Sequence, residues 1–475
     1  MLGLLGTLDL AARGLATQRQ GVEVAGHNLT NASNTAYSRQ RVAIQSTVGN
    51  DGRFGSYGTG SEVVAIQQIR SELLDSQLVN EGSVGGSLQA QQRGLQYAQA
   101  RLGQNLDRTS SGSDVAAGAG LGGGRQISAG LAQLFTAFQS LSANPTSISE
   151  RQVTLSRASD LASQFNQIDA NLGGIETQLN ESLGSDAQQA NHLLGDIAKL
   201  NERISRMEAS GSSPANDLRD HRQAKLEELS KLVRFDSVQG ADGAVDIAIS
   251  GVSFVSSGLV SSRLETFDSG GGRLEIRASG TTTALPLTGG SLHGTLDVRE
   301  GPVRELRLAL RSIAESLIVE VNGLHAGGFG LGGTTGQPFF VGTTATDIRV
   351  NPALIADPAK IQASGDAASP GNNQVVLTLA QLSSRGLTAL GGQTFTGRHG
   401  AAVAALGESL ASVNRQISDH EVVSTMLTSQ RDSVSGVSVD EEMTNLTRFQ
   451  RAYQASAKLI TTVDEMLEVT LGLKR

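Results

Sequence analysis

Apolar residues recur every seven positions near both ends of the chain. This is the a/d spacing of a coiled-coil seam, and it predicts a long helix at each terminus. We name ten such positions the assembly seam: Leu8, Leu15, Val22 and Leu29 near the N-terminus, and Met443, Leu446, Tyr453, Ala457, Ile460 and Leu467 near the C-terminus. Ser438 and Glu441 have the spacing of a capping box, which predicts where the last helix begins. We expect the two stripes to pair with each other or with neighbouring chains.

Each stripe could instead cover a globular core. Against that alternative, polar side chains interrupt both stripes, namely Gln18 and Arg19 in the first and Gln450 and Asp464 in the second. Narrow, interrupted stripes are marginal for a helix standing alone. We therefore expect the terminal segments to be poorly ordered in the free monomer and to fold on association.

Between its two ends the chain changes periodicity twice. Helical spacing of apolar residues fills 150–233, with a change of phase near Gly184. Residues 235–290 alternate like strands and are bounded by Gly and Ser clusters. Helical spacing then returns over 300–325 and again over 403–426. The order helix, bundle, strands, bundle, helix brings both termini into one unit.

The predicted fold is mainly α with a small β-rich insertion. It consists of paired terminal coiled-coil helices, a long helix bundle and a nested outer β domain. A chain of 475 residues has room for two to four domains. The predicted domains are 1–60 with 425–475 (terminal coiled coil), 61–234 with 296–424 (helix bundle) and 235–295 (β-rich insertion).

Composition and charge narrow the set of partners. The formal charge is −8, from 38 basic and 46 acidic residues, which argues against nucleic acid as a partner. No stretch approaches the roughly 18 consecutive apolar residues of a transmembrane helix, so we expect no membrane insertion. Cysteine is absent, which excludes disulfides and thiolate chemistry. Glycine is abundant and aromatic residues make up only 3%, so helices should pack through small side chains on long seams.

Residue patterns that carry chemistry are missing. The seven histidines include no pair at the i, i+4 spacing of a zinc-binding helix. Gly118–Gly123 matches GxGxxG, but no apolar strand precedes it, so a flexible loop is the better interpretation. We predict no catalytic residue, no cofactor and no metal site, and hence no enzyme.

Two terminal motifs resemble those of a known family. NLTNASNTAYSRQ (Asn28–Gln40) is similar to the N-terminal signature of axial proteins of the bacterial flagellum, and Val437–Leu467 resembles their C-terminal motif. The signature residues here are Asn28, Asn31, Tyr37, Ser38, Arg39 and Gln40. The SRQ after the tyrosine is typical of the hook-associated protein 1 family, the first junction proteins between hook and filament. Internal segments also resemble that family, including NDLRDHR (Asn216–Arg222).

One departure concerns the turn before the tyrosine. Family members commonly have Pro-Gly there, whereas this chain has Thr35-Ala36 before Tyr37. Glycine would permit a positive φ that alanine adopts only at a cost, so the turn could differ locally.

The resemblance implies a structural subunit of the junction between hook and filament. It implies a helical ring of about eleven copies of the chain, with the hook protein and the second junction protein as neighbours. It also implies export in an unfolded state through the flagellar type III apparatus, with an export chaperone on the C-terminal helix. The protein would then be secreted to the flagellum after a transient stay in the cytoplasm. The main alternative is another axial subunit, of hook, distal-rod or filament type.

Overall fold

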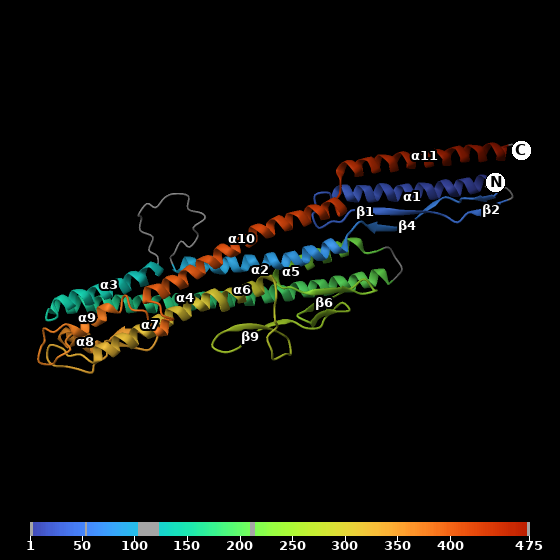
Figure 1. Ribbon diagram of the computed structural model, residues 1–475. Helices are drawn as coiled ribbons and strands as arrows, with labels where there is room; N and C mark the ends of the chain where they lie inside the picture. Colours follow the sequence, from blue (N-terminus) through green and yellow to red (C-terminus); the bar gives the residue numbers. More distant parts are fainter. Residues whose placement is uncertain (1–2, 53–54, 103–122, 210–213, 473–475) are drawn as a thin grey trace.

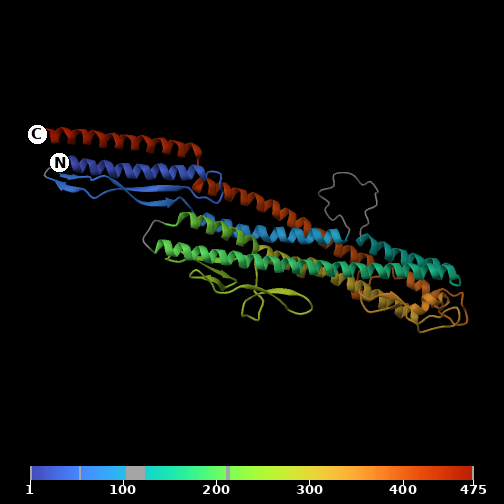
Figure 2. The same ribbon diagram turned by 180° about the vertical axis from the view of Figure 1, so that it is seen from behind.

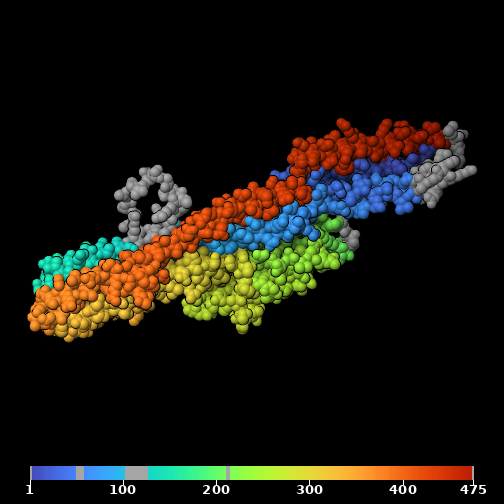
Figure 3. Space-filling model, in the orientation of Figure 1, coloured from blue at the N-terminus to red at the C-terminus, as the bar shows by residue number. Residues whose placement is uncertain are grey.

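The molecule is a long rod with both chain ends at one tip. The computed structural model describes residues 3–52, 55–102, 123–209 and 214–472. In Figures 1 and 2 a terminal unit carries the N and C marks at one end, and a helix bundle extends away from it. The β-rich insertion lies along one side of the bundle, as the space-filling view also shows (Figure 3).

Two long helices and a β-ribbon make up the terminal unit. Helix α1 (Leu4–Thr30) lies beside α11 (Val439–Gly472), and the two run in opposite directions (Figures 1 and 2). Strand β1 (Gln40–Ser46) pairs antiparallel with β4 (Ser61–Gln68) and packs on α1. The short strands β2 (Asn50–Gly52) and β3 (Gly55–Tyr57) extend this ribbon. The ribbon therefore begins directly after the polar loop that follows α1.

The bundle consists of seven named helices of very different length. They are α2 (Glu72–Leu102), α3 (Gly123–Ala143), α4 (Ile148–Glu208), α5 (Asn216–Leu232), α6 (Gly290–Val298), α7 (Arg304–Ala326) and α10 (Phe395–Ser435). A π-helical turn at Arg299–Val303, which contains Pro302, joins α6 to α7. Helix α10 runs from the bundle up to the terminal unit, so it is the return path of the chain (Figure 1).

Helix α4 explains the change of phase near Gly184. The helix is continuous over 61 residues, but its two halves serve different hydrophobic clusters. Residues Leu155 to Leu179 belong to a cluster with α3 and α7, whereas Leu183 to Ala198 belong to a cluster with α5 and the β-insertion. The buried stripe takes two successive four-residue steps, Leu179 to Leu183 to Ala187, where one cluster ends and the other begins.

The β-rich insertion packs its apolar face on α4. Four strands form a meander in the order β5 (Asp236–Gln239), β6 (Val245–Ile249), β7 (Val252–Ser256) and β8 (Leu259–Val260), followed by a hairpin of β9 (Leu264–Asp268) and β10 (Leu274–Ala278). Ser250-Gly251 and Ser257-Gly258 both have positive φ, as tight hairpin turns require. Ile247, Ile249 and Phe254 are fully or almost fully buried. The mainly α fold with a small β insertion is thereby confirmed, while the domain boundaries stay a proposal.

Short elements close the far end of the bundle. They are β11 (Phe340–Val341), β12 (Arg349–Val350), α8 (Pro352–Ala356), α9 (Gln374–Gln381) and two 3₁₀ turns at Pro358–Lys360 and Thr388–Leu390. The buried Arg151 guanidinium donates to the carbonyls of Pro145 and Ile361, at 2.9 and 2.6 Å, and so ties this cap to α4. His325 is fully buried beside it. Its Nδ1 lies 2.8 Å from the Gln337 carbonyl, and its Nε2 accepts from the Gln362 amide at 3.0 Å.

We predict that His325 makes the bundle less stable in mild acid. Burial lowers the pKa of His325 to about 4, from 6.5 in the unfolded chain. The unfolded state therefore binds the extra proton first, and stability falls as the pH drops from 6.5 toward 4, by up to about 3 kcal/mol. Burial also lowers the pKa of His399, which adds to the same slope. Urea unfolding between pH 7 and pH 4 measures the effect.

A neutral His325→Gln variant should have a flatter pH dependence, although its stability at pH 7 is lower. His192→Gln is the matched control, because His192 is exposed on α4. An unchanged slope in His325→Gln would contradict this assignment of the proton.

Candidate assembly site at the terminal helix pair

The start of α11 is defined by its cap and by its charges. Ser438 Oγ accepts from the Glu441 amide at 3.4 Å, which is one half of the predicted capping box. The other half is absent, because the Glu441 carboxylate instead lies 2.7 Å from Arg39 Nη1. Asp440, Glu441 and Glu442 all lie in the first turn, where the helix dipole favours negative charge.

The contact between α1 and α11 repeats every seven residues. A Cβ at Gly14 would lie 3.4 Å from Ser456 Oγ, and a Cβ at Gly21 would lie only 2.5 Å from the Phe449 ring. One heptad further along α1, Asn28 Nδ2 donates to Glu442 Oε2 at 3.0 Å. The glycines of α1 thus leave a groove into which the larger side chains of α11 fit.

The assembly-seam residues divide between the inside and the outside of this pair. Leu8, Leu15, Val22, Leu29, Leu446, Ala457, Ile460 and Leu467 are half-buried. Met443 and Tyr453 are exposed, at 47% and 36%. The residues that α11 buries most are Glu442 and Val463, which the seven-residue stripe does not include.

The face of α11 that packs against α1 is displaced by one residue from the face predicted from the sequence. The heptad spacing predicts Met443 and Ala457 as the intermediate seam positions, with Gln450 and Asp464 as polar interruptions between them. Both interruptions are exposed. The intermediate positions that face α1 are instead Glu442, Phe449, Ser456 and Val463. The apolar pair Phe449 and Val463 was the available signal, and the polar Glu442 and Ser456 concealed it.

Asn28 lies at the centre of a cluster of polar contacts where α1 ends and α11 begins. We call this cluster the polar joint; it also includes Tyr37, Arg39, Gln40 and Glu442. Asn28 is 1% exposed, and its amide nitrogen donates to the Gln40 carbonyl at 2.8 Å as well as to Glu442. Its oxygen accepts from the Gln40 amide at 2.9 Å and from the Tyr37 hydroxyl at 2.7 Å. One side chain therefore ties the last turn of α1 to the loop, to β1 and to α11. Asn31 plays a smaller part, donating to the His27 carbonyl at 3.0 Å.

Arg39 neutralises the buried carboxylate of this joint. Glu442 is only 3% exposed, and Arg39 Nε and Nη2 lie 2.9 and 2.7 Å from its Oε1. A buried carboxylate is tolerated when it is paired and hydrogen-bonded in this way. Burial, together with the carboxylates of Asp217, Asp220 and Glu442, raises the pKa of Tyr37 far above its usual range. The tyrosine hydroxyl accordingly stays protonated and remains a donor to Asn28.

The turn before Tyr37 is built without a left-handed residue. The Ala36 amide donates to Asn34 Oδ1 at 3.1 Å, which closes an Asx turn. Across the described ranges, the non-glycine residues with positive φ are Ser250 and Ser257, so Ala36 needs no glycine-like conformation. The Thr35-Ala36 departure is therefore accommodated locally.

The described residues give no sign of a chemical centre. Within the described part of the chain, no group of three or more His, Asp or Glu side chains could hold a metal ion. A search of the same residues finds no helix both long enough and apolar enough to cross a bilayer. The glycine motif at Gly118–Gly123 lies almost wholly outside the described residues. What the site offers is two helices, a polar joint and exposed apolar side chains, which is a surface for assembly.

Comparisons with known proteins agree with that interpretation. Residues 120–340 match the family model for the flagellar hook-associated protein FlgK helical domain, and 428–473 match that for the flagellar basal body rod FlgEFG protein C-terminal region. Flagellar hook-associated protein 1 of Bacillus subtilis is 25% identical, covering 98% of this chain and 97% of its own length. The Escherichia coli protein of the same name is 24% identical, covering 98% of this chain and 99% of its own length.

A solved structure shares the fold. The flagellar hook junction protein FlgK from Burkholderia pseudomallei superposes with a TM-score of 0.62, at 17% identity, over 76% of this chain and all of the other. This likeness shows that the two chains share a fold. Along nearly its whole length the chain is similar to proteins named flagellar hook-associated protein 1, and 120–340 match the helical domain of that family. This is a family of structural proteins rather than enzymes.

We predict that adding one methyl group at Gly21 disrupts the helix pair. The new Cβ of Gly21→Ala would collide with the Phe449 ring, so Phe449 must leave its groove, at a cost of about 1–3 kcal/mol. Gly26→Ala is the matched control, because no atom lies within 4 Å of its added Cβ. The control should stabilise α1 by up to about 1 kcal/mol through helix propensity alone.

Amide hydrogen exchange of α1 in the purified full chain measures the difference between the two variants. Equal protection in both would show that Gly21 and Phe449 are not in contact.

Proposed function

We propose that the protein is a structural subunit of the bacterial flagellum that forms the junction between hook and filament. The observation that carries the proposal is similarity along 98% of the chain to proteins named flagellar hook-associated protein 1. The helix pair at the chain ends provides the physical means of assembly, because it places apolar side chains on the outside of a long rod.

The outer face of α11 supports lateral assembly. Val439, Met443, Tyr453, Met466 and Val469 are all exposed, between 36% and 63%. Exposed apolar side chains on a helix that already has one partner are suited to a second contact, with a different surface of a neighbouring copy. Heterologous contacts of this kind close into rings or continue as helices. We propose a helical ring of about eleven subunits, with the hook protein and the second junction protein above and below it.

Export is part of the same proposal. The chain would pass unfolded through the type III export apparatus of the flagellum after a transient stay in the cytoplasm. An export chaperone would bind the C-terminal helix α11. This is supported by the exposed apolar side chains on that helix, which need cover before assembly.

Another axial subunit, of hook, distal-rod or filament type, is the alternative. The match of 428–473 to the basal body rod model favours it, because that segment is shared among axial proteins. The match of 120–340 to the helical domain of the hook-associated family favours the junction instead.

A genetic test separates the junction from the alternatives. Cells without the gene should build hooks and secrete flagellin without retaining filaments, and the intact gene should restore motility. Tyr453→Asp should fail to restore it, because it places a charge at an apolar seam position of α11 that is 36% exposed. Swimming in soft agar and electron microscopy of hooks are the measurements.

Ile355→Asp is the control for this test. Ile355 is 54% exposed on α8, at the opposite end of the rod, so this variant should restore motility. Full motility with Tyr453→Asp would rule out the outer face of α11 as an assembly surface.

We further propose that the free tip of the helix pair is held weakly until neighbours arrive. At the joint, polar contacts tie α1 to α11 and to the ribbon, and tie the loop after α1 to α5, whereas the tip has only its own unit for support. In the dilute monomer, amide protection in both helices should therefore fall from the joint toward the chain ends. Uniform strong protection along both helices would refute this account.

A further inference from the structure

The segment NDLRDHR, at the start of α5, faces the terminal unit. Asn216 Nδ2 donates to the Ile66 carbonyl of β4 at 2.8 Å, and Gln68 Nε2 donates to the Asn216 carbonyl at 2.9 Å. One residue on, Asp217 Oδ1 accepts from Gln40 Nε2 at 2.9 Å. Helix α5 thus meets both strands of the ribbon.

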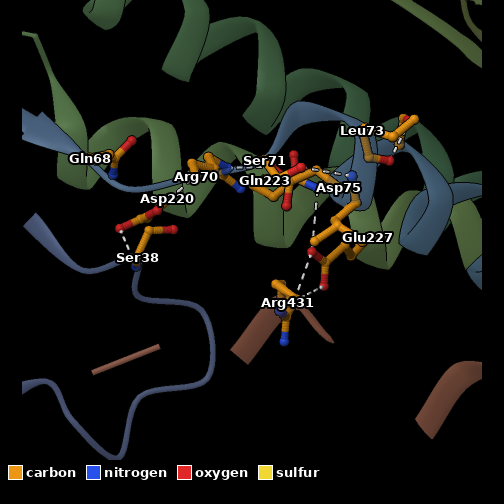
Figure 4. A network of polar contacts seen from close by, with 12 residues as sticks. Ser38, Gln68, Arg70, Ser71, Leu73, Asp75, Asp220, Gln223, Glu227 and Arg431 are labelled. Atoms are coloured by element: carbon orange, nitrogen blue, oxygen red, sulfur yellow. Dashed lines mark hydrogen bonds and ion pairs between the residues drawn. The ribbon is translucent and has the colours of Figure 1, made fainter. Parts of the chain in front are cut away.

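Asp220 makes the most buried of these contacts. It is 5% exposed, and its two oxygens accept from the Ser38 amide at 3.1 Å and from Arg70 Nη1 at 3.2 Å (Figure 4). Arg70 also pairs with Asp75, at 2.5 Å. Ser38 lies in the loop after α1 and Arg70 lies between β4 and α2, so a single carboxylate joins two separate segments of the chain.

The opposite side of the same segment is fixed to the bundle and to the β-insertion. Arg219 forms a double hydrogen bond with Glu208 of α4, at 2.8 and 2.9 Å. Arg222, 5% exposed, donates to Asn201 of α4 at 3.0 Å and to the Gly243 carbonyl at 2.6 Å. The start of α5 is therefore a rigid part of the bundle that presents polar groups to the terminal unit.

Apolar packing does not fix the terminal unit in place. Among the described residues, neither large hydrophobic cluster includes any residue of α1, α11 or the ribbon. The space between the two parts includes a cavity of about 460 Å³, lined largely by polar residues such as Arg70, Glu227 and Arg431. Figure 4 shows Arg431 of α10 reaching Glu227 of α5 across this region, at 3.3 Å. Hydrogen bonds are directional, whereas apolar contacts can slide.

We propose that Asn216, Asp217 and Asp220 form an orientation bracket, which sets the angle between the terminal unit and the rest of the rod. Each bracket residue binds the loop after α1, the ribbon or Arg70, and Asp220 is satisfied in only one arrangement of the two parts. When the bracket is lost, the terminal unit pivots on the two chain connections near Ile69 and Gly436. The effect of such a pivot on a ring rests on the proposed function, but the bracket itself does not.

The bracket contributes to geometry more than to stability. Burial is the largest influence on Asp220 and raises its pKa above the ordinary range, although the Ser38 amide and Arg70 oppose that rise. A carboxylate that is costly to bury adds little to folding, so its removal should leave the bundle folded. The bracket residues are thus positioning residues whose effect appears in an inter-domain distance.

The absence of cysteine makes the distance measurable. Val64→Cys on β4 and Lys199→Cys on α4, whose side chains are exposed, accept one spin label each in the full chain. In this labelled parent, pulsed electron paramagnetic resonance should give one narrow distribution of the distance between the two labels. Adding Asn216→Ala and Asp220→Ala should widen that distribution roughly twofold or more, while circular dichroism and the melting temperature of the bundle stay nearly unchanged.

Controls keep the test decisive. Glu228→Ala removes an exposed carboxylate of the same helix, which pairs with Lys225 within that helix, and should leave the distribution narrow. If the double variant fails to fold, Gln40→Ala with Arg70→Ala removes the partners from the other side and should widen the distribution equally. A broad distribution in the labelled parent, or an unchanged one in both bracket variants, would overturn the bracket. Because no flagellum is involved, neither result bears on the junction role.

Discussion

The structure depends on one buried ion pair between the two ends of the chain. Glu442 lies almost fully buried, and Asn28, 414 residues away in sequence, donates to its carboxylate while Arg39 neutralises it. Leaving such a carboxylate unpaired costs several kcal/mol, so the chain ends are stable together only in this register. The opposed direction of α1 and α11, the shared tip of the two termini and the free outer face of α11 all follow from it.

Different interactions stabilise the bundle and set the orientation of the terminal unit. Two hydrophobic clusters, joined by the continuous α4, hold the bundle and the β-insertion together. The terminal unit is attached to α5 through polar contacts of Ser38 and Gln40 in the signature and of Gln68 and Arg70 at the end of the ribbon. Apolar burial supplies most of the free energy of folding, and directional hydrogen bonds supply the geometry. A subunit that joins two different structures benefits from an angle that can be set independently of its core.

The sequence predicted the elements better than their faces. The long helices and the β-rich insertion follow directly from the periodicity of apolar residues. The change of phase near Gly184 marks the place along α4 where one hydrophobic cluster ends and the other begins. The face of α11 that contacts α1 could not be predicted from the sequence, because two of its residues, Glu442 and Ser456, are polar. Their partners on α1 are distant in sequence and are revealed only by the structure. The role of Asp220 was equally hidden, since its partners Ser38 and Arg70 are distant in sequence. Family resemblance identified the signature residues but not the contacts that they make.

Disulfide trapping in this cysteine-free chain tests the central claim, that the two termini pair in opposite directions within one molecule. The Cβ of Gly14→Cys and the sulfur of Ser456→Cys would lie at a separation that a disulfide can close with small shifts. Mild oxidation of the dilute double variant should give a cross-link within one chain. Gly26→Cys with Ser456→Cys should give none, because Gly26 lies more than three helical turns from Gly14 in the direction of the joint. Cross-links between chains, or equal yields from both pairs, would contradict the account.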